Sequence, residues 1–281
     1  MNQEKSLLEA INEHLSSDDF ELPVFSPIAA KVQALARNDR AGADQIEAVL
    51  LHDAALSSQI LRIANSPFYA GLAKVDTIKT AITRLGLHEI VNVAVLCTQR
   101  GHFKSRDAHI NQLMAKLWQH SLACAIASRW LALRCDFRHK AAEAFMAGLF
   151  HDIGTLVLFK ALDDIGASGA WVKDLPEALM FELIRTLHTH QGARLIRKWN
   201  LSETYAQIAE QHHDERIDDG NVLALIVRLA DHASLKLGLD LQQDHDIVLT
   251  ALPETAALGI KEIALAELEI MLEDSTVKMA A

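Results

Sequence analysis

The chain has 281 residues, of which 50% are hydrophobic, with 27 lysines and arginines against 37 aspartates and glutamates. This composition is sufficient for a buried core and excludes a disordered protein. The formal net charge of −10 and the absence of a basic stripe argue against nucleic-acid binding. The length predicts about two structural units, at roughly 150 residues each.

The three cysteines, Cys97, Cys124 and Cys135, form no C-x-x-C pair and are odd in number. Neither a disulfide framework nor a cysteine zinc site is therefore expected. The N-terminus lacks the pattern of a signal peptide, and no uninterrupted apolar run approaches the roughly 18 residues of a membrane span. We expect a cytoplasmic protein that does not enter a membrane.

Apolar residues recur at the spacing of amphipathic helices along most of the chain, and strand-like alternation is scarce. Only five prolines interrupt the sequence, which leaves long stretches free to form helices. The first segment expected to be helical is 46–63. A second helical pattern begins at about residue 77 and includes the strand-like run 91–95. Further helices are expected at 110–131, 222–237 and 261–274. The sequence therefore predicts an all-α fold.

Three clusters of glycine and charged residues interrupt these patterns, at 101–107, 217–221 and 238–245. They predict an N-terminal helical lobe at 1–105, a histidine-bearing lobe at 106–237 and a C-terminal helical extension at 238–281. We find no 20–50-residue repeat and no glycine-rich phosphate loop, so a P-loop or Rossmann protein is not predicted.

Several of the 14 histidines fall on apolar helix faces, where an unpaired ring costs free energy. His120, for example, follows Leu113 and Leu117 by seven and three residues, which places all three on one face. The histidines expected to face inward are His120, His151, His190, His212 and His213. A single such histidine is more often a hydrogen-bonded core residue than a ligand, so the argument depends on the group.

Two carboxylates lie in similar apolar surroundings, Asp152 beside His151 and Asp231 four residues after Val227. Buried carboxylates are unusual without a partner. Imidazoles and carboxylates that converge in a dry interior suit Zn, Fe, Mn or Ni. Seven inward-facing groups exceed one tetrahedral site and would suffice for two ions that share a bridging carboxylate.

The His-Asp dipeptide occurs four times, at 52–53, 151–152, 213–214 and 245–246. Only the copy at 151–152 has small and apolar residues before it and Ile153-Gly154 after it. We expect Gly154 to end the helix and to fix the pair at its end. His52 is expected at the surface.

The ordered series His120, GLFHDIG at 148–154, His190, the double histidine at 212–213 and Asp231 resembles the HD superfamily of metal-dependent phosphohydrolases. More specifically, the chain resembles the HDOD family of bacterial regulatory domains. The segments that carry this second resemblance are LPVFSPIAAKVQALA at 22–36, LLHDAALSSQILRIANSPFY at 50–69, AITRLGLHEIVNVAV at 81–95 and HTHQGARLIRKWNLSETYAQIAEQHH at 188–213. The resemblance covers roughly residues 20–235.

The resemblance implies a multi-helix domain of bacterial signalling, with a counterpart for nearly every metal ligand of the related HD-GYP phosphodiesterases. His120, His151 and Asp231 would hold one ion, and the other would be held by His190, His212 and His213. Asp152 would bridge the two and take part in catalysis. A nucleotide or a cyclic dinucleotide is the substrate class that the analogy suggests.

Three departures from the HD-GYP pattern weaken the case for catalysis. Thr155 replaces a lysine that would neutralise phosphate charge, the GYP loop is missing after the double histidine, and Lys116 stands where some of these enzymes place a glutamate for a further metal. The alternative is a catalytically inactive scaffold that binds a signalling protein. Direct DNA binding is disfavoured by the charge balance.

Overall fold

The computed structural model describes residues 7–17, 20–38, 42–66, 68–69, 71, 73–167, 175–216, 218 and 220–279, with side chains up to residue 274. Within these ranges the chain is helical and contains no strand, as the apolar spacing predicts. The α-helices are α1 (Leu7–Ser16), α2 (Pro27–Ala36), α3 (Ala43–Leu51), α4 (Ala54–Ala64), α5 (Ile78–Leu85), α6 (Leu87–Gln99), α7 (Ala108–Arg134), α8 (Ala141–Phe150), α9 (Ile153–Ala167), α10 (Glu177–Lys198), α11 (Glu203–Gln211), α12 (Val222–Lys236), α13 (Pro253–Ala257) and α14 (Glu262–Met279).

Local capping divides two of the predicted helices. Asp53 separates α3 from α4, because its carboxylate accepts a hydrogen bond from the Leu56 amide and starts a new helix. Gly86 adopts a φ of 83° between α5 and α6, a conformation that glycine reaches without steric cost. The strand-like run at 91–95 lies inside α6, as predicted.

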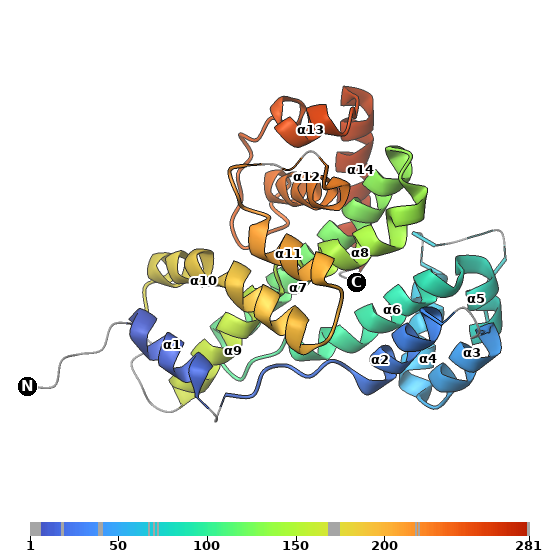
Figure 1. The fold of residues 1–281 in the computed structure, drawn as a ribbon, viewed down its shortest axis with the longest axis horizontal. Coiled ribbons are helices and arrows are strands. Elements are labelled where there is room, and N and C mark those ends of the chain that lie inside the picture. The colour runs from blue at the N-terminus through green and yellow to red at the C-terminus, as the bar shows by residue number, and fades with distance from the viewer. Residues whose placement is uncertain are drawn as a thin grey trace, which may run out of the picture.

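The 27-residue helix α7 begins at the Asp107 cap and forms the axis of the second half of the molecule. It packs against α8, α9, α12 and α14, and α10 in turn packs against α9 and α11 (Figure 1). The connection from α6 to α7 falls at residues 100–107, near the predicted boundary. The division into lobes at 1–105 and 106–237 stays a prediction.

The segment before α2 contacts the histidine-bearing helices. Figure 1 shows α1 beside α9 and α10, where the Arg194 guanidinium donates to the Leu15 carbonyl at 3.1 Å. The Trp199 indole N–H donates to the Pro23 carbonyl at 2.7 Å. This part of the predicted N-terminal lobe is therefore anchored on the other half of the chain.

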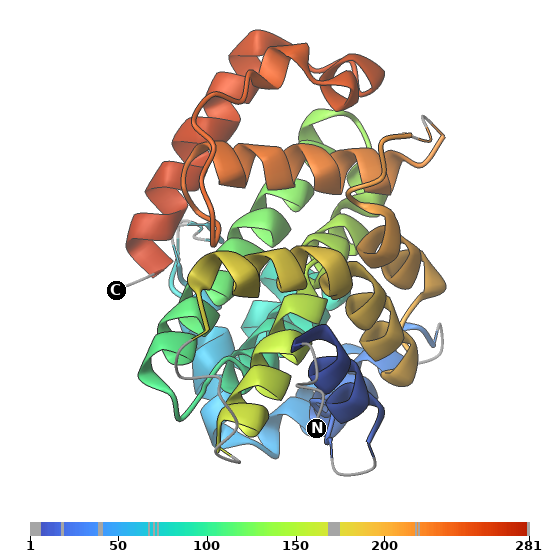
Figure 2. The ribbon, with the colours of Figure 1, turned by 90° about the vertical axis from the view of Figure 1, so that its left-hand side faces the viewer.

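The C-terminal extension folds back onto the core. α12 begins at Val222 as predicted, whereas Ile217 and Asp219 of the preceding break lie outside the described residues. α14 packs along α7, and two ion pairs hold it: Arg134 with Glu267 at 2.9 Å and Lys236 with Glu269 at 2.7 Å. Figure 2 shows this helix crossing the end of α12.

One stretch of the described chain, Arg138–Ala167, is long and apolar enough to cross a membrane. However, 89% of its apolar window is buried inside the fold, where α8 and α9 form part of the core. The pair Ile78–Leu85 and Leu87–His102 meets the same criterion only if both helices are taken together, and they are bent by 119°. Burial within the protein accounts for the apolar character of Arg138–Ala167.

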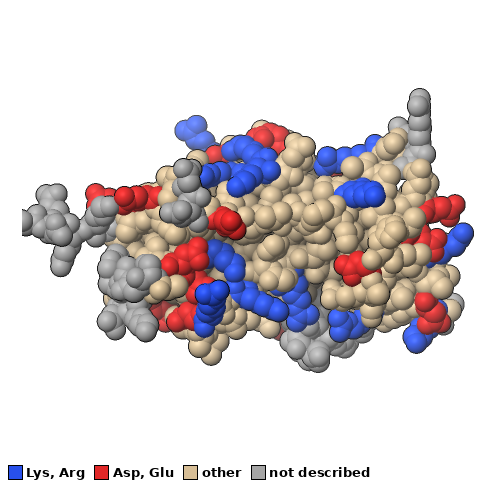
Figure 3. Space-filling model, turned by 90° about the horizontal axis from the view of Figure 1, so that it is seen from below, with Lys and Arg blue, Asp and Glu red and all other residues tan. Residues whose placement is uncertain are grey.

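Basic and acidic side chains are intermixed on the face of the molecule seen in Figure 3. Red and blue side chains touch at the lower left of this view, several basic side chains lie near one another along its lower middle, and most of the face is uncharged. The expectation that the protein does not bind nucleic acid stays a prediction.

Candidate metal centre

His151 and Asp152 occupy the two-residue junction between α8 and α9. Gly148 lies one turn earlier on the face of α8 that meets α7, and a Cβ atom there would lie 2.5 Å from the Cys124 carbonyl oxygen. Only glycine permits this approach, because real Cβ contacts are never so short. The close packing of α8 on α7 brings His151 to His120.

Gly154 has the corresponding role between α9 and α10. A Cβ atom at this position would lie 1.8 Å from the His188 carbonyl oxygen. The expectation that Gly154 ends a helix is wrong, because α8 already ends at Phe150 and Gly154 is the second residue of α9. Its contribution is the close helix contact that places Asp152 beside His188.

The first group of side chains lies at the α7 side of the junction. The Nε2 atoms of His120 and His151 are 3.2 Å apart, and Asp231 Oδ1 lies 3.4 Å from the first and 3.7 Å from the second. Both histidines are 1% exposed. Cys124, one turn after His120, completes a set whose ligand atoms all lie within 4.8 Å of one another.

The second group lies on α10 and at the end of α11. The Nε2 atoms of His188 and His212 are 3.4 Å apart, and His213 lies beside them with a ring-centroid distance of 4.0 Å to His212. Asp152 Oδ1 is 3.4 Å from His188 Nε2 and accepts a hydrogen bond from the Thr155 hydroxyl at 3.2 Å. The rings of His151 and His212 are 5.1 Å apart, so the two groups are contiguous.

Backbone carbonyls orient three of these imidazole rings. The Nδ1 atoms of His151, His188 and His212 lie 2.8 to 3.0 Å from the carbonyl oxygens of Gly148, Ile184 and Ala209. A carbonyl can only accept, so Nδ1 carries the proton and a neutral ring presents its Nε2 lone pair to the cluster. Lone pairs that face one another in a dry interior fit a shared cation, and the set of imidazole and carboxylate donors suits a transition metal.

The charges within the first group are strongly coupled. Burial alone would lower the pKa of His151, but the adjacent Asp231 carboxylate raises it to about 9. Burial would raise the pKa of Asp231, but contact with His151 and nearby His120 lowers it instead. In the metal-free protein the two side chains therefore form a buried ion pair.

The second group has the opposite electrostatics. Burial, together with His151 and His213, lowers the pKa of His212 well below its usual value. Burial likewise lowers the pKa of His213. His212 is therefore neutral near pH 7, which is the form of imidazole that binds a metal.

Six of the seven predicted site residues come together, and one does not. The expectation that His190 faces the interior is wrong: its side chain is 70% exposed, and Nδ1 lies 4.0 Å from Glu210. His188, two residues earlier and 3% exposed, occupies the expected place. His213 is an exposed residue at the edge of the cluster rather than an inward-facing one. His52 is exposed, as predicted.

Sequence reasoning missed three members of the centre: His188, Cys124 and Asp240. The cysteine pattern predicts no cysteine metal site, but Cys124 follows His120 by four residues, which places both on one helix face. Its buried Sγ donates to the Ser234 hydroxyl at 3.4 Å, and burial raises its pKa well above the usual value. Asp240 lies in the loop after α12, with Oδ1 3.8 Å from His120 Nδ1.

Arg228 of α12 supports the double histidine from outside the cluster. Its guanidinium donates to the carbonyl oxygens of His212 and Asp214, both at 2.8 Å, and to the Glu254 carboxylate at 2.7 Å. Glu254 belongs to α13 and is 1% exposed. The C-terminal extension is therefore connected to the position of His212.

Residues 22–215 match the HDOD domain family, which is most of the chain, and the protein therefore belongs to this family. A crystal structure of an HDOD domain protein of unknown function from Geobacter sulfurreducens matches with a TM-score of 0.74 and 23% identity, over 96% of this chain and 94% of that one. A Shewanella amazonensis protein whose name proposes a metal-dependent phosphohydrolase matches with a TM-score of 0.74 and 19% identity, over 96% and 98% of the two chains.

A Marinobacter aquaeolei protein whose name proposes a role in signal transduction has a TM-score of 0.68 and 19% identity, over 96% of this chain and 62% of that one. Among curated proteins, an uncharacterized Treponema pallidum protein is 22% identical over 202 residues, which is 69% of this chain. The chain spans 38% of the length of that relative. These likenesses establish the shared helical fold.

Proposed function

We propose that this protein is a bacterial signalling protein that retains an HD-type metal site and hydrolyses a phosphate ester of a nucleotide or cyclic dinucleotide. The observation that carries the proposal is the convergence of buried imidazole Nε2 atoms and two carboxylates on one point of the fold. The Shewanella amazonensis name supports the phosphohydrolase class, and the Marinobacter aquaeolei name supports signalling.

The side chains divide into two ligand sets. His120, His151 and Asp231 would hold one Fe, Mn, Ni or Zn ion, with Cys124 as a further donor, and the second ion would be held by His188, His212 and His213. Asp152 would bridge the two sets, since it follows His151 in the chain and contacts His188. Bound ions would polarise the phosphate and lower the pKa of a bound water towards neutrality.

Thr155 contacts the carboxylate of Asp152. The Thr155 hydroxyl donates to one carboxylate oxygen of Asp152 and is itself 1% exposed, so it fixes the orientation of the carboxylate. A lysine at this position would instead bring a positive charge towards phosphate. The buried threonine is the observation that favours the second candidate function, a metal-containing scaffold that binds a signalling partner without hydrolysis.

Hydrolysis by the metal-loaded protein decides between these candidates. The untagged protein, reconstituted anaerobically with iron(II) or manganese(II), would be assayed with bis(p-nitrophenyl) phosphate and with a cyclic dinucleotide. We expect hydrolysis that Asp152→Asn abolishes and His190→Ala leaves intact, because His190 lies outside the cluster. A protein that holds its metal but hydrolyses neither compound would refute the enzyme and support the scaffold.

A further inference from the structure

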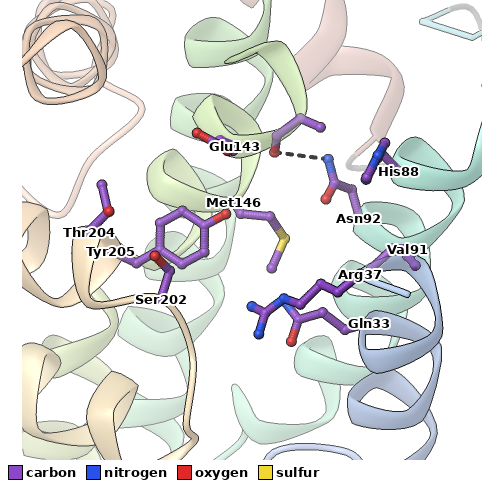
Figure 4. Close-up of a pocket in the computed structure, with 12 residues that line it drawn as sticks. Gln33, Arg37, His88, Val91, Asn92, Glu143, Met146, Ser202, Thr204 and Tyr205 are labelled. Carbon is purple, nitrogen blue, oxygen red and sulfur yellow. Dashed lines mark hydrogen bonds between the residues drawn. The ribbon is translucent and has the colours of Figure 1, made fainter. Parts of the chain in front are cut away.

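A cavity of about 370 Å³ lies between α2, α6, α8 and α11 (Figure 4), and none of its lining residues belongs to the histidine cluster. We name it the four-helix pocket. Its lining includes Gln33 of α2 and Arg37 directly after it, Asn92 of α6, Glu143 and Met146 of α8, and Tyr205 of α11. The size of the cavity is in the range of small-molecule sites, which are typically about 300–1,000 Å³.

Tyr205 presents an unused hydroxyl to this pocket. The residue is 8% exposed, and its ring reaches into the cavity with the hydroxyl towards the centre (Figure 4). Burial, with the nearby charge of Glu143, raises the pKa of Tyr205 to about 12, so the hydroxyl keeps its proton. No described residue forms a hydrogen bond with that hydroxyl, and it is not among the buried atoms shut off from solvent, so it is open to the pocket and can donate to a ligand there.

Asn92 is the second buried polar group at the pocket, at 3% exposure. Its Nδ2 donates to the Ala142 carbonyl at 3.1 Å, which fixes the amide plane (Figure 4). Its Oδ1 accepts no hydrogen bond from the described residues and is not among the buried atoms shut off from solvent, so it is open to the pocket. A ligand that donates from a hydroxyl or an amino group would satisfy this oxygen.

Arg37 is the one lysine or arginine that lines the four-helix pocket, and its side chain extends from the C-terminal end of α2 into the cavity in Figure 4. It forms no ion pair within the part of the chain that the structure describes. The acidic lining residue, Glu143, has its own cation, since Lys140 Nζ lies 3.9 Å from it. Among the described residues no carboxylate pairs with the guanidinium, which faces the cavity.

We propose that the four-helix pocket binds a small organic oxyanion, a carboxylate or a phosphate ester, that also carries a hydroxyl or amino group. Arg37 and the Tyr205 hydroxyl would donate to the oxyanion, and Asn92 Oδ1 would accept from the second group. Long-range electrostatic attraction does not account for such binding, because the chain has a net charge of −10, which repels anions. The proposal is independent of metal binding and of the proposed hydrolysis.

Met146 offers a local reporter, because this buried side chain lines the pocket while Met114 and Met180 do not. The full chain, labelled with ¹³C-methyl methionine and with Met146 assigned through Met146→Leu, would be titrated with glycerol 3-phosphate, with lactate and with neutral glycerol. We expect a saturable shift of the Met146 signal with at least one of the two anions and none with glycerol. The anion that causes the shift identifies the phosphate or the carboxylate source.

Matched variants separate this site from other anion binding. Arg37→Gln should weaken the affinity about tenfold or more, because hydrogen bonds to charged groups are among the strong ones. Tyr205→Phe should weaken it by a smaller factor. Lys31→Gln, which removes the same charge from an exposed position of α2 outside the pocket, should leave the affinity unchanged. The absence of a saturable Met146 shift with both anions, or an equal affinity in Arg37→Gln, would overturn the proposal.

Discussion

At the scale of single residues, hydrogen bonds to backbone carbonyls leave the Nε2 lone pair of three rings free in the candidate metal centre. His151, His188 and His212 each direct Nδ1 to the carbonyl of the preceding helical turn. This second contact fixes both tautomer and ring plane, as is usual for histidines that bind metals. In the metal-free protein, Asp231 holds a proton on His151 instead.

The raised pKa of His151 predicts a pH-dependent metal affinity. A metal must displace the proton, so affinity should rise about tenfold per pH unit below about 9 and level off above it. A chelator that competes with the Cys124→Ser variant for the metal, from pH 6 to pH 10, measures how the affinity depends on pH. The variant lacks the thiol, whose proton the metal would otherwise also displace. An affinity that does not change with pH, once chelator protonation is corrected, would contradict the His151–Asp231 pair.

His188 and His190 show that helical periodicity alone does not predict which of two nearby histidines faces the interior. His190 follows Leu183 and Leu187 at helical spacing, but these leucines lie at the edge of the buried stripe of α10. The centre of the stripe is the row Ile184, His188 and Gly192, spaced four residues apart. The two histidines of the HTH segment at 188–190 could be recognised from the sequence. Which of the two rings faces inward is determined by the position at which α9 packs on α10. Asp240 lies in a loop, to which no periodicity applies.

At the scale of elements, glycines at two helix crossings bring the ligands together. The HD dipeptide could be chosen from its apolar context, and the all-α fold followed from spacing. The sequence did not reveal that Gly154 serves a contact between α9 and α10 rather than a helix end, because a close approach involves two segments that are distant in sequence.

Gly154→Ala should therefore lower the free energy of unfolding by about 3 kcal/mol or more, the upper end of the cost of overpacking. The added methyl group would meet the backbone of His188, which cannot move aside as a flexible side chain would. Chemical denaturation followed by circular dichroism measures the change. Gly101→Ala, where the added atom meets nothing within 4 Å, is the control, and equal stability of the two variants would refute the packing argument.

Through Glu254, α13 of the extension contacts Arg228. The Arg228 guanidinium donates a hydrogen bond to the His212 carbonyl and forms an ion pair with Glu254. Glu254→Ala removes this carboxylate and leaves a mostly buried cation without its ion-pair partner. We expect a loss of stability of about 3 kcal/mol and a metal affinity weakened about tenfold. Glu267→Ala breaks the half-exposed pair with Arg134 on α14 and should cost less than about 1 kcal/mol. Unfolding curves and metal titrations that do not distinguish the variants would contradict this role.

At the scale of the whole molecule, the four-helix pocket and the metal centre lie at opposite ends of the same two helices. α8 contributes Met146 to the pocket and ends beside His151, and α11 begins next to Tyr205 and ends beside His212. A ligand that shifts the start of either helix would displace a metal ligand at its end. Such an arrangement could connect a small-molecule signal to the metal site.

If the helices couple the two sites, the effect must be reciprocal, because linkage acts equally on both equilibria. Metal loading should change the oxyanion affinity reported by Met146 by the same factor as the oxyanion changes metal affinity. Two titrations, each with and without the other ligand, measure both factors. Oxyanion binding that leaves metal affinity unchanged would show that α8 and α11 hold two independent sites.

The most direct test of the metal centre is the elemental content of the untagged protein beside His188→Ala and His190→Ala, purified without chelator. The two variants lose the same side chain two residues apart on α10, one buried in the cluster and one 70% exposed. We predict close to two equivalents of a transition metal in the wild type and in His190→Ala, and a clear loss in His188→Ala. No metal in the wild type, even after anaerobic reconstitution with iron or manganese, would contradict the account.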